Sequence, residues 1–353
     1  MVSLDVVKAS NRAVVKKQPI TAVFVGATQG IGEYALRQLA LAHGSSGQGL
    51  RIYLVGRKEG AARTILSEAA VTCPGGDFRF IPTEDISLLN EVDRVCAEIA
   101  RAEAEAVGST RTACVDLLVM TQAYFAVGDQ MQSNINSEGL ESSLSLLYYS
   151  RMRFIMQLLP LLTASPLAGR VVSVFGGPEA KLDLDNLALL KPGTLGFLTQ
   201  GSHTTWMTTL LFERLAAQHR GKLSLNHYFP GYVLRWDLDN RPGLTLWFKI
   251  LSVLLWPIIL LIRVGLQESG ERVIYHTSDR FAALPAGNTV GAEIAKSTDG
   301  IPGGGAYKVG TKGDITPLPK VYSEIDKEET SQKIWDHTMK AFEDISAGRK
   351  FSP

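Results

Sequence analysis

Three glycines near the start of the chain have the spacing that backbone binding of a phosphate group requires. They lie in the run Val-Gly-Ala-Thr-Gln-Gly-Ile-Gly of residues 25–32. Gly26 allows a tight turn after a strand, Gly30 lets the backbone approach a pyrophosphate, and Gly32 lets helix and strand pack closely. A helix that begins near Gly30 directs its free N–H groups at such a phosphate. The run therefore predicts a dinucleotide site made by Gly26, Thr28, Gln29, Gly30, Ile31 and Gly32.

The end of the second predicted strand distinguishes between two dinucleotides. A protein that binds NAD usually places a carboxylate there, which accepts hydrogen bonds from the ribose hydroxyls. This chain has Gly56, Arg57 and Lys58 instead. Because a planar guanidinium suits a 2′-phosphate, Arg57 and Lys58 predict NADP(H) as the cofactor. A solvated surface pair of cations is the alternative interpretation of these two residues.

These residues lie within a regular alternation of predicted strands and helices. Strands are predicted at residues 20–25, 50–55, 78–81, 115–120, 170–174 and 222–228, and helices at residues 30–43, 61–70, 91–106, 140–159 and 198–219. The fourth of these helices is expected to end near Pro160. The alternation predicts an α/β fold, a Rossmann-like doubly wound parallel sheet. Residues 306–309 could add a last strand at the sheet edge, and residues 322–346 a helical tail.

We expect residues 1–353 to form a single domain with a hydrophobic lid insertion. Residues 18–235 are predicted to be the dinucleotide-binding core, 236–270 the apolar lid and 271–353 a C-terminal extension. The uninterrupted apolar run within residues 244–262 is shorter than the ~20 residues that a membrane-spanning helix needs. A lid over a lipophilic substrate, peripheral membrane contact and core or dimer packing remain open for residues 244–262.

Composition narrows the classes of partner. The chain of 353 residues is 45% hydrophobic and 20% charged, and its formal net charge is +1, which gives no reason to expect nucleic acid. Its cysteines, Cys73, Cys96 and Cys114, have neither disulfide nor metal-ligand spacing, and no metal site is predicted. Residues 1–18 lack the apolar stretch of a signal peptide. We therefore expect a cytoplasmic protein, with membrane association through residues 244–262 as the alternative.

With Asp85-Ile86-Ser87 after the third predicted strand and Pro230-Gly231 after the sixth, residues 18–235 resemble the short-chain dehydrogenase/reductase family. The resemblance implies that Asp85 contacts the adenine. Thr121, in the stretch that replaces the family's Asn-Asn-Ala-Gly, is predicted to line the cofactor site. Residues 181–185 and 268–272 look like a fungal branch found in secondary-metabolite pathways. Family members are commonly dimers or tetramers, so a homo-oligomer is an expectation.

The catalytic part of the family's pattern is absent from this chain. Tyr-x-x-x-Lys occurs nowhere, and alignment of the matching helix puts Phe197 and Gly201 at the tyrosine and lysine positions. A shift of one residue puts Gly196 and Gln200 there instead, and the family's helix asparagine falls near Leu147. In the family the tyrosine protonates the carbonyl oxygen. A positioned acid typically contributes ~10²–10⁴-fold in rate, so the proton donor of this chain is open.

Three other polar residues are weak candidates for a catalytic group. His203 follows the vacant lysine position on the same predicted helix. Tyr149, next to Tyr148, lies on the helix that carries the family's asparagine, and Ser173 shortly precedes the place of the family's serine. Each has a structural alternative: a locally hydrogen-bonded histidine, core or interface aromatics, and a strand serine.

These observations predict an NADPH-dependent short-chain reductase that acts on a lipophilic small molecule. The resemblance suggests a polyketide-like or terpenoid-like substrate, reduced by hydride transfer to an activated C=C or C=O bond. Two alternatives remain open. The first is a non-redox cyclase or isomerase that reuses the same pocket, and the second is a catalytically silent binding or scaffold protein.

Overall fold

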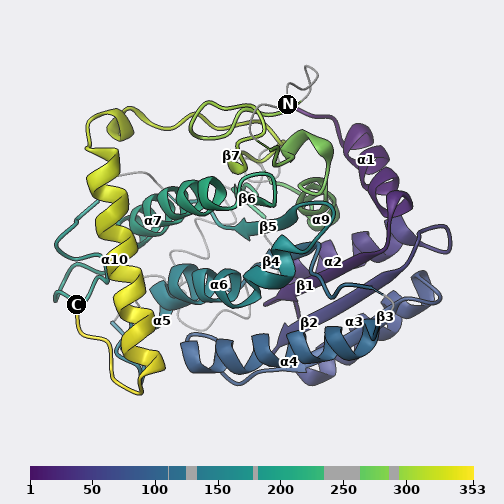
Figure 1. Cartoon of the computed structure of the whole chain (residues 1–353), viewed down its shortest axis with the longest axis horizontal. Coiled ribbons are helices and arrows are strands. Elements are labelled where there is room, and N and C mark those ends of the chain that lie inside the picture. Colours follow the sequence, from purple (N-terminus) through teal and green to yellow (C-terminus); the bar gives the residue numbers. More distant parts are fainter. Residues whose placement is uncertain (110, 125–132, 178–181, 234–262, 286–293) are drawn as a thin grey trace, which may run out of the picture.

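A single parallel sheet forms the centre of the molecule (Figure 1). The computed structural model describes residues 1–109, 111–124, 133–177, 182–233, 263–285 and 294–353. The sheet has seven strands in the order β3-β2-β1-β4-β5-β6-β7, and every strand pairs in parallel with its neighbours. The order runs outward from β1 in both directions, as in a doubly wound sheet. The predicted Rossmann-like fold is therefore confirmed, and the edge strand lies where it was expected.

The strands are short, and most of their residues are buried. They are β1 Ile20–Val25, β2 Leu50–Gly56, β3 Asp77–Pro82, β4 Leu117–Met120, β5 Gly169–Val174, β6 Leu223–Tyr228 and β7 Ala306–Val309. All residues of β1, β4, β5 and β6 are buried. Continuous apolar runs such as β4 are what a strand covered on both faces requires.

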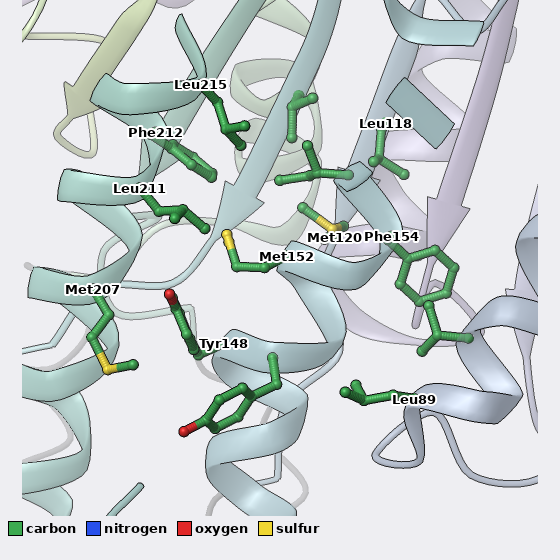
Figure 2. Packing of buried hydrophobic residues seen from close by; sticks show 14 of the residues in the cluster. Leu89, Leu118, Met120, Tyr148, Met152, Phe154, Met207, Leu211, Phe212 and Leu215 are labelled. Carbon is green, nitrogen blue, oxygen red and sulfur yellow. The ribbon is translucent and has the colours of Figure 1, made fainter. Parts of the chain in front are cut away.

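Helices cover both faces of the sheet. They are α1 Leu4–Lys17, α2 Gly30–His43, α3 Glu59–Thr72, α4 Leu89–Val107, α5 Ser142–Leu144, α6 Ser150–Thr163, α7 Phe197–Gln218, α9 Leu266–Tyr275 and α10 Lys327–Ser346. One buried apolar cluster joins α4, α6, α7 and α10 to one face. Figure 2 shows part of this cluster, where Met152 of α6 lies between Met120 of β4 and Leu211 of α7. A second cluster joins α1, α2, α3 and α9 to the other face.

Two helices differ from the sequence-based expectation. α1 was not predicted, because most of its residues are polar or exposed; it buries Val7, Val14 and Val15 on one side. The predicted helix at residues 140–159 consists of α5, a π-helical turn Ser145–Tyr149, and α6. The prediction that it ends near Pro160 is wrong, since α6 continues through Pro160 to Thr163. Leu162 is fully buried, so core packing offsets the one hydrogen bond that proline lacks.

The C-terminal helix α10 packs on α7 and α4 at one side of the molecule (Figure 1). Tyr148 and Thr338 form a hydroxyl–hydroxyl hydrogen bond of 2.8 Å. Lys327 forms a 2.7 Å ion pair with Glu213 of α7. The predicted helical tail is thus part of the core, in the same buried cluster as α4, α6 and α7.

The predicted lid lies largely outside the described residues. Residues 234–262 are not described, and this range includes the apolar stretch 244–262. The last residues of the expected lid, from Leu266 on, belong instead to α9, which packs on α1 and α2. The lid, the membrane contact and the domain boundaries stay predictions. None of the described helices is long and apolar enough to cross a membrane.

Candidate functional site

A cavity of about 460 Å³ lies at the carboxyl ends of the central strands. Its walls come from the loops that follow β1, β2, β3, β4, β5 and β6. In an open parallel sheet, the point where the strand order reverses leaves a crevice at this edge, and ligands bind there. The cavity brings together predicted cofactor residues from four loops: Gly26, Thr28, Gln29, Gly30, Ile31, Arg57, Lys58, Asp85 and Thr121.

The glycine loop is closely packed below the cavity and open above it. Gly26 has a φ of +74°, and a Cβ there would lie 2.7 Å from the backbone nitrogen of Gln122. A Cβ on Gly32 would lie 2.5 Å from Thr121 Oγ1, so Gly32 packs behind the loop and does not line the cavity. Gly30 has a φ of +64°, and a Cβ there would meet no atom within 4 Å. Gly30 therefore borders open space that a phosphate could fill.

The N-terminus of α2 faces this space without a side-chain cap. The helix begins at Gly30, and its N-cap residue, Gln29, makes no capping hydrogen bond. The first N–H groups of a helix have no partner within the helix, and they carry the positive end of the helix dipole. This end of α2 can therefore hold an anionic group such as a pyrophosphate.

The cationic side of the cavity comes from the turn after β2. Arg57 and Lys58 are exposed and line the cavity beside Gln29. Lys58 Nζ donates to Gln29 Oε1 over 3.3 Å. No carboxylate of the described residues forms an ion pair with either cation, so both could pair with a phosphate.

Two predicted residues are held by local hydrogen bonds. Thr121 Oγ1 lies 3.1 Å from the carbonyl oxygen of Val25 and donates to the end of β1. It thereby fixes the loop after β4 to the glycine loop. Asp85 Oδ1 accepts the N–H of Ser87 over 2.9 Å, which leaves its other carboxylate oxygen for a donor such as the adenine amino group.

Gln122 is a cavity residue that the sequence did not single out. Its side chain is 5% exposed, and neither its amide nitrogen nor its amide oxygen has a hydrogen-bond partner among the described residues. Buried amides are normally paired. An amide that lines a cavity and has no partner fits a bound ligand with both a donor and an acceptor.

The far end of the cavity has none of the family's catalytic side chains. Gly176 lines it after β5. A Cβ on the neighbouring Gly177 would lie 2.6 Å from the Cα of Gly201, so this loop lies directly on the backbone of α7. The described lining residues include no tyrosine. Their cations, Arg57 and Lys58, both come from the turn after β2 and not from α7. The first cavity alone therefore offers no proton donor of the family's kind.

His203 lies outside the cavity and is fully buried. Its Nε2 accepts the N–H of Asp183 over 3.3 Å, and its Nδ1 lies 3.4 Å from the carbonyl oxygen of Leu187. Burial lowers the pKa of His203, which favours this neutral arrangement. His203 thus ties the loop before α7 to the helix.

Tyr149 and Ser173 do not line the cavity either. The Tyr149 hydroxyl lies 2.6 Å from Nε2 of His337 on α10, and burial raises its pKa well above the usual value. Ser173 Oγ accepts a 2.8 Å hydrogen bond from Arg151 Nη1. All three weak catalytic candidates therefore have structural partners.

Arg151 is a buried cation that sequence reasoning missed. It is fully buried in α6, and burial lowers its pKa to about 9. Its guanidinium donates to the carbonyl oxygens of Gln122, at 2.6 Å, and Val174, at 3.1 Å. It therefore joins the ends of β4 and β5, where both loops form the cavity wall. An arginine within an apolar helix is the only sign of this role in the sequence.

The described residues contain no group of three or more histidine, cysteine or acidic side chains that could hold a metal ion. The three cysteines are free and buried. No metal site was predicted, and none of these residues suggests one.

The fold and the cavity define a dinucleotide-binding protein of the Rossmann type, and comparison with known proteins gives the family. The chain is 38% identical to the short-chain dehydrogenase/reductase SAT2 of Stachybotrys chartarum, over 98% of each chain. It is 37% identical to the oxidoreductase AN1596 of Emericella nidulans, over 96% of this chain and 97% of that protein. No protein-family model matches the chain. The chain belongs to the short-chain dehydrogenase/reductase family, a family of oxidoreductases, and the resemblance is confirmed.

Solved structures agree on the fold. The angucycline C-6 ketoreductase LanV, with bound NADP, matches with a TM-score of 0.54 and 18% identity over 75% of this chain and 90% of that chain. The NADPH-dependent reductase YwfH of bacilysin biosynthesis matches with a TM-score of 0.52 and 15% identity, over 74% of this chain and 93% of that chain. These shares leave part of the present chain without a counterpart in either structure.

Proposed function

We propose that this chain is an NADPH-dependent reductase that passes a hydride to an activated C=O or C=C bond of a lipophilic small molecule. The observation that carries the proposal is the position of Arg57. It lies at the end of β2 and lines the same cavity as the glycine loop. A carboxylate at this place would favour NADH, whereas a guanidinium favours a 2′-phosphate.

Different cavity residues would contact different parts of the cofactor. Gly30 and the N-terminus of α2 would hold the pyrophosphate, Arg57 and Lys58 the 2′-phosphate, and Asp85 the adenine. The unpartnered amide of Gln122 would bind the part of the cofactor that lies nearer the loops after β4 and β5. When bound there, NADPH would supply a hydride for a carbon atom of the substrate, and water would supply the proton. Two structures named as NADP or NADPH complexes, LanV and a blue fluorescent protein from a metagenomic library, support this choice of cofactor.

The substrate class rests on the relatives and on the walls of the site. The similar fungal proteins carry names of oxidoreductases and of a short-chain dehydrogenase/reductase. LanV is named as a ketoreductase of an angucycline. Phe175, Phe229 and Pro230 give one end of the cavity an apolar lining. A lipophilic secondary metabolite is the substrate class that agrees with these features.

The test is substrate-dependent loss of NADPH absorbance with a panel of apolar ketones and enones, with product analysis. The proposal expects turnover with at least one member, and much less turnover with NADH. Turnover that persists without any cofactor would instead favour the non-redox isomerase or cyclase. The absence of the family's tyrosine and lysine is the observation behind that second candidate. No turnover together with no cofactor binding would overturn the reductase and favour a catalytically silent binding protein.

A further inference from the structure

A second cavity, of about 530 Å³, adjoins the first. Phe175, Gly176 and Phe229 line both cavities. The remaining walls come from the first turns of α7 and from β6, β7 and the segments that follow them. Its size is within the range of about 300–1,000 Å³ that small-molecule sites occupy. A molecule bound there would lie next to the catalytic end of the proposed cofactor site.

The rim of this cavity is apolar and open to solvent. Large hydrophobic side chains that line it are exposed: Phe197 by 52%, Leu198 by 62%, Phe229 by 40% and Tyr232 by 60%. Single exposed apolar residues are ordinary on a protein surface, but a gathered patch marks a binding site. The gathering of these four around one hollow favours an apolar ligand.

The floor of the cavity is polar and incompletely hydrogen-bonded. Thr205 of α7 is 1% exposed and His227 of β6 is 4% exposed, and both line the cavity. Neither Thr205 Oγ1 nor His227 Nδ1 has a hydrogen-bond partner among the described residues. Buried polar atoms without partners destabilise a fold. Two such atoms in one cavity indicate a polar group on the ligand.

The chemistry of the floor allows hydrogen bonds in both directions. Burial, followed by the charges of Lys308 and Arg151, lowers the pKa of His227 to about 3, so its ring is neutral. A backbone group of Phe175 pairs with the ring, which leaves Nδ1 as an acceptor. The Thr205 hydroxyl can donate, and the ammonium group of Lys308, on the same cavity wall, is a donor.

We infer that the second cavity binds the substrate as an apolar ketone and the product as the corresponding alcohol, with the oxygen against Thr205, His227 and Lys308. This inference rests on the proposed function for the direction of the reaction. Reduction adds a hydride to the carbonyl carbon and a proton from water to its oxygen. The ketone oxygen accepts from Thr205 or Lys308, and the alcohol hydroxyl donates to His227 Nδ1.

The test measures binding by equilibrium dialysis of the full chain with trans-1-decalone, its alcohol, and the hydrocarbon trans-decalin, without cofactor. We expect the ketone and the alcohol to bind at least about tenfold more tightly than decalin, as one or two hydrogen bonds provide. Thr205→Val removes the hydroxyl and keeps the side-chain shape. It should weaken decalone binding about five- to tenfold, while the free protein stays as stable as before or becomes more stable.

Thr208→Val is the matched control. Thr208 lies on the same helix, is 1% exposed and also has an Oγ1 without a partner among the described residues, but it does not line the cavity. This variant should leave decalone binding unchanged. Equal effects of the two variants, no effect of Thr205→Val, or no advantage of decalone over decalin would overturn the inference. NADPH binding is measured separately, so loss of cofactor binding with intact decalone binding counts against the proposed function alone.

Discussion

At the scale of single residues, the two ends of the site follow different rules. The proposed cofactor end has glycines and cations at the positions where backbone approach and phosphate charge would require them, as at Gly30 and Arg57. At the other end, backbone replaces side chains, since the loop at Gly177 lies directly on Gly201. Thr205 and His227 offer polar atoms one cavity further on. Cofactor choice and substrate binding can therefore be tested by separate substitutions.

Arg57→Asp should reverse the cofactor preference. The change removes a guanidinium from the proposed 2′-phosphate site and adds a carboxylate that repels the phosphate and suits ribose hydroxyls. We expect NADPH binding to weaken by ~1.5–3 kcal/mol, while NADH binding stays equal or improves. The measurement is calorimetric titration with both cofactors.

Arg63→Asp is the control for that prediction. Arg63 lies on the neighbouring helix α3, is exposed, pairs with Glu59 over 2.8 Å and does not line the first cavity. It should change neither cofactor's affinity. Parallel losses of NADPH and NADH binding in Arg57→Asp would remove Arg57 from the 2′-phosphate site.

Tyr149→Phe should lower stability and leave cofactor-dependent activity intact. The Tyr149 hydroxyl contacts Nε2 of His337 over 2.6 Å and does not line the first cavity. Losing this buried hydrogen bond should cost ~1–3 kcal/mol in the free energy of unfolding. Denaturant unfolding and NADPH oxidation are measured on the same sample. If activity falls sharply while stability is unchanged, Tyr149 has a catalytic role after all.

At the scale of elements, α10 joins parts of the chain that are distant in sequence. Trp206 of α7 stacks on Tyr322, just before α10, with ring centroids 3.7 Å apart and planes at 3°. The guanidinium of Arg214 lies 4.3 Å from the ring centroid of Trp335. Both contacts support the outer side of α7, whose other side carries Thr205. The C-terminal extension thus stabilises the helix that forms one wall of the second cavity.

Tyr322→Ala should destabilise the protein through the loss of this stacking. Removing a buried aromatic side chain costs roughly 3 kcal/mol or more, and Tyr322 is 7% exposed. NADPH affinity should not change, because Tyr322 does not line the first cavity. Tyr322→Phe keeps the stacked ring and serves as the control in urea unfolding. A weakened NADPH affinity in a variant of normal stability would contradict this structural role.

At the scale of the whole molecule, buried histidines make stability depend on pH. Burial lowers the pKa of His227 and of His276 to about 3, and that of His337 to about 4. The unfolded chain binds protons at these sites below pH ~6.5, whereas the folded chain does not until pH falls to the lower values. Their contribution is therefore fully present above pH ~6.5 and is lost as pH falls.

We expect the free energy of unfolding to decrease as pH falls from about 6.5 to 5, by up to about 1.4 kcal/mol per pH unit for each such histidine. Carboxylates stay largely ionised in this window, so the histidines dominate the slope. His276→Asn should make the slope shallower by one such contribution, since His276 is fully buried. Urea unfolding at several pH values measures it. A flat profile, or the same slope in the variant, would contradict this explanation.

The sequence predicted the part of the molecule that follows local rules. Strand and helix periodicity was enough to predict the sheet, and the glycine loop after β1 pointed to residues around Gly30 and Arg57 that line the first cavity. α1 was not predicted, because its few buried valines lie among polar residues. Arg151 was not predicted, because its partners at the ends of β4 and β5 become its neighbours only in the folded chain. The second cavity was not predicted either, because Thr205, His227 and Lys308 come from α7, β6 and β7. The periodicity of apolar residues carries no information about contacts between residues that are distant in sequence.

Calorimetric titration of the full chain with NADPH and, separately, with NADH tests the proposed cofactor site most directly. We expect micromolar binding of NADPH and clearly weaker binding of NADH, because the 2′-phosphate would pair with Arg57 and Lys58 at the cavity that the glycine loop borders. Binding of neither cofactor by the folded protein would contradict it. The glycine loop would then be only a turn in the fold, and a role without redox chemistry would take its place.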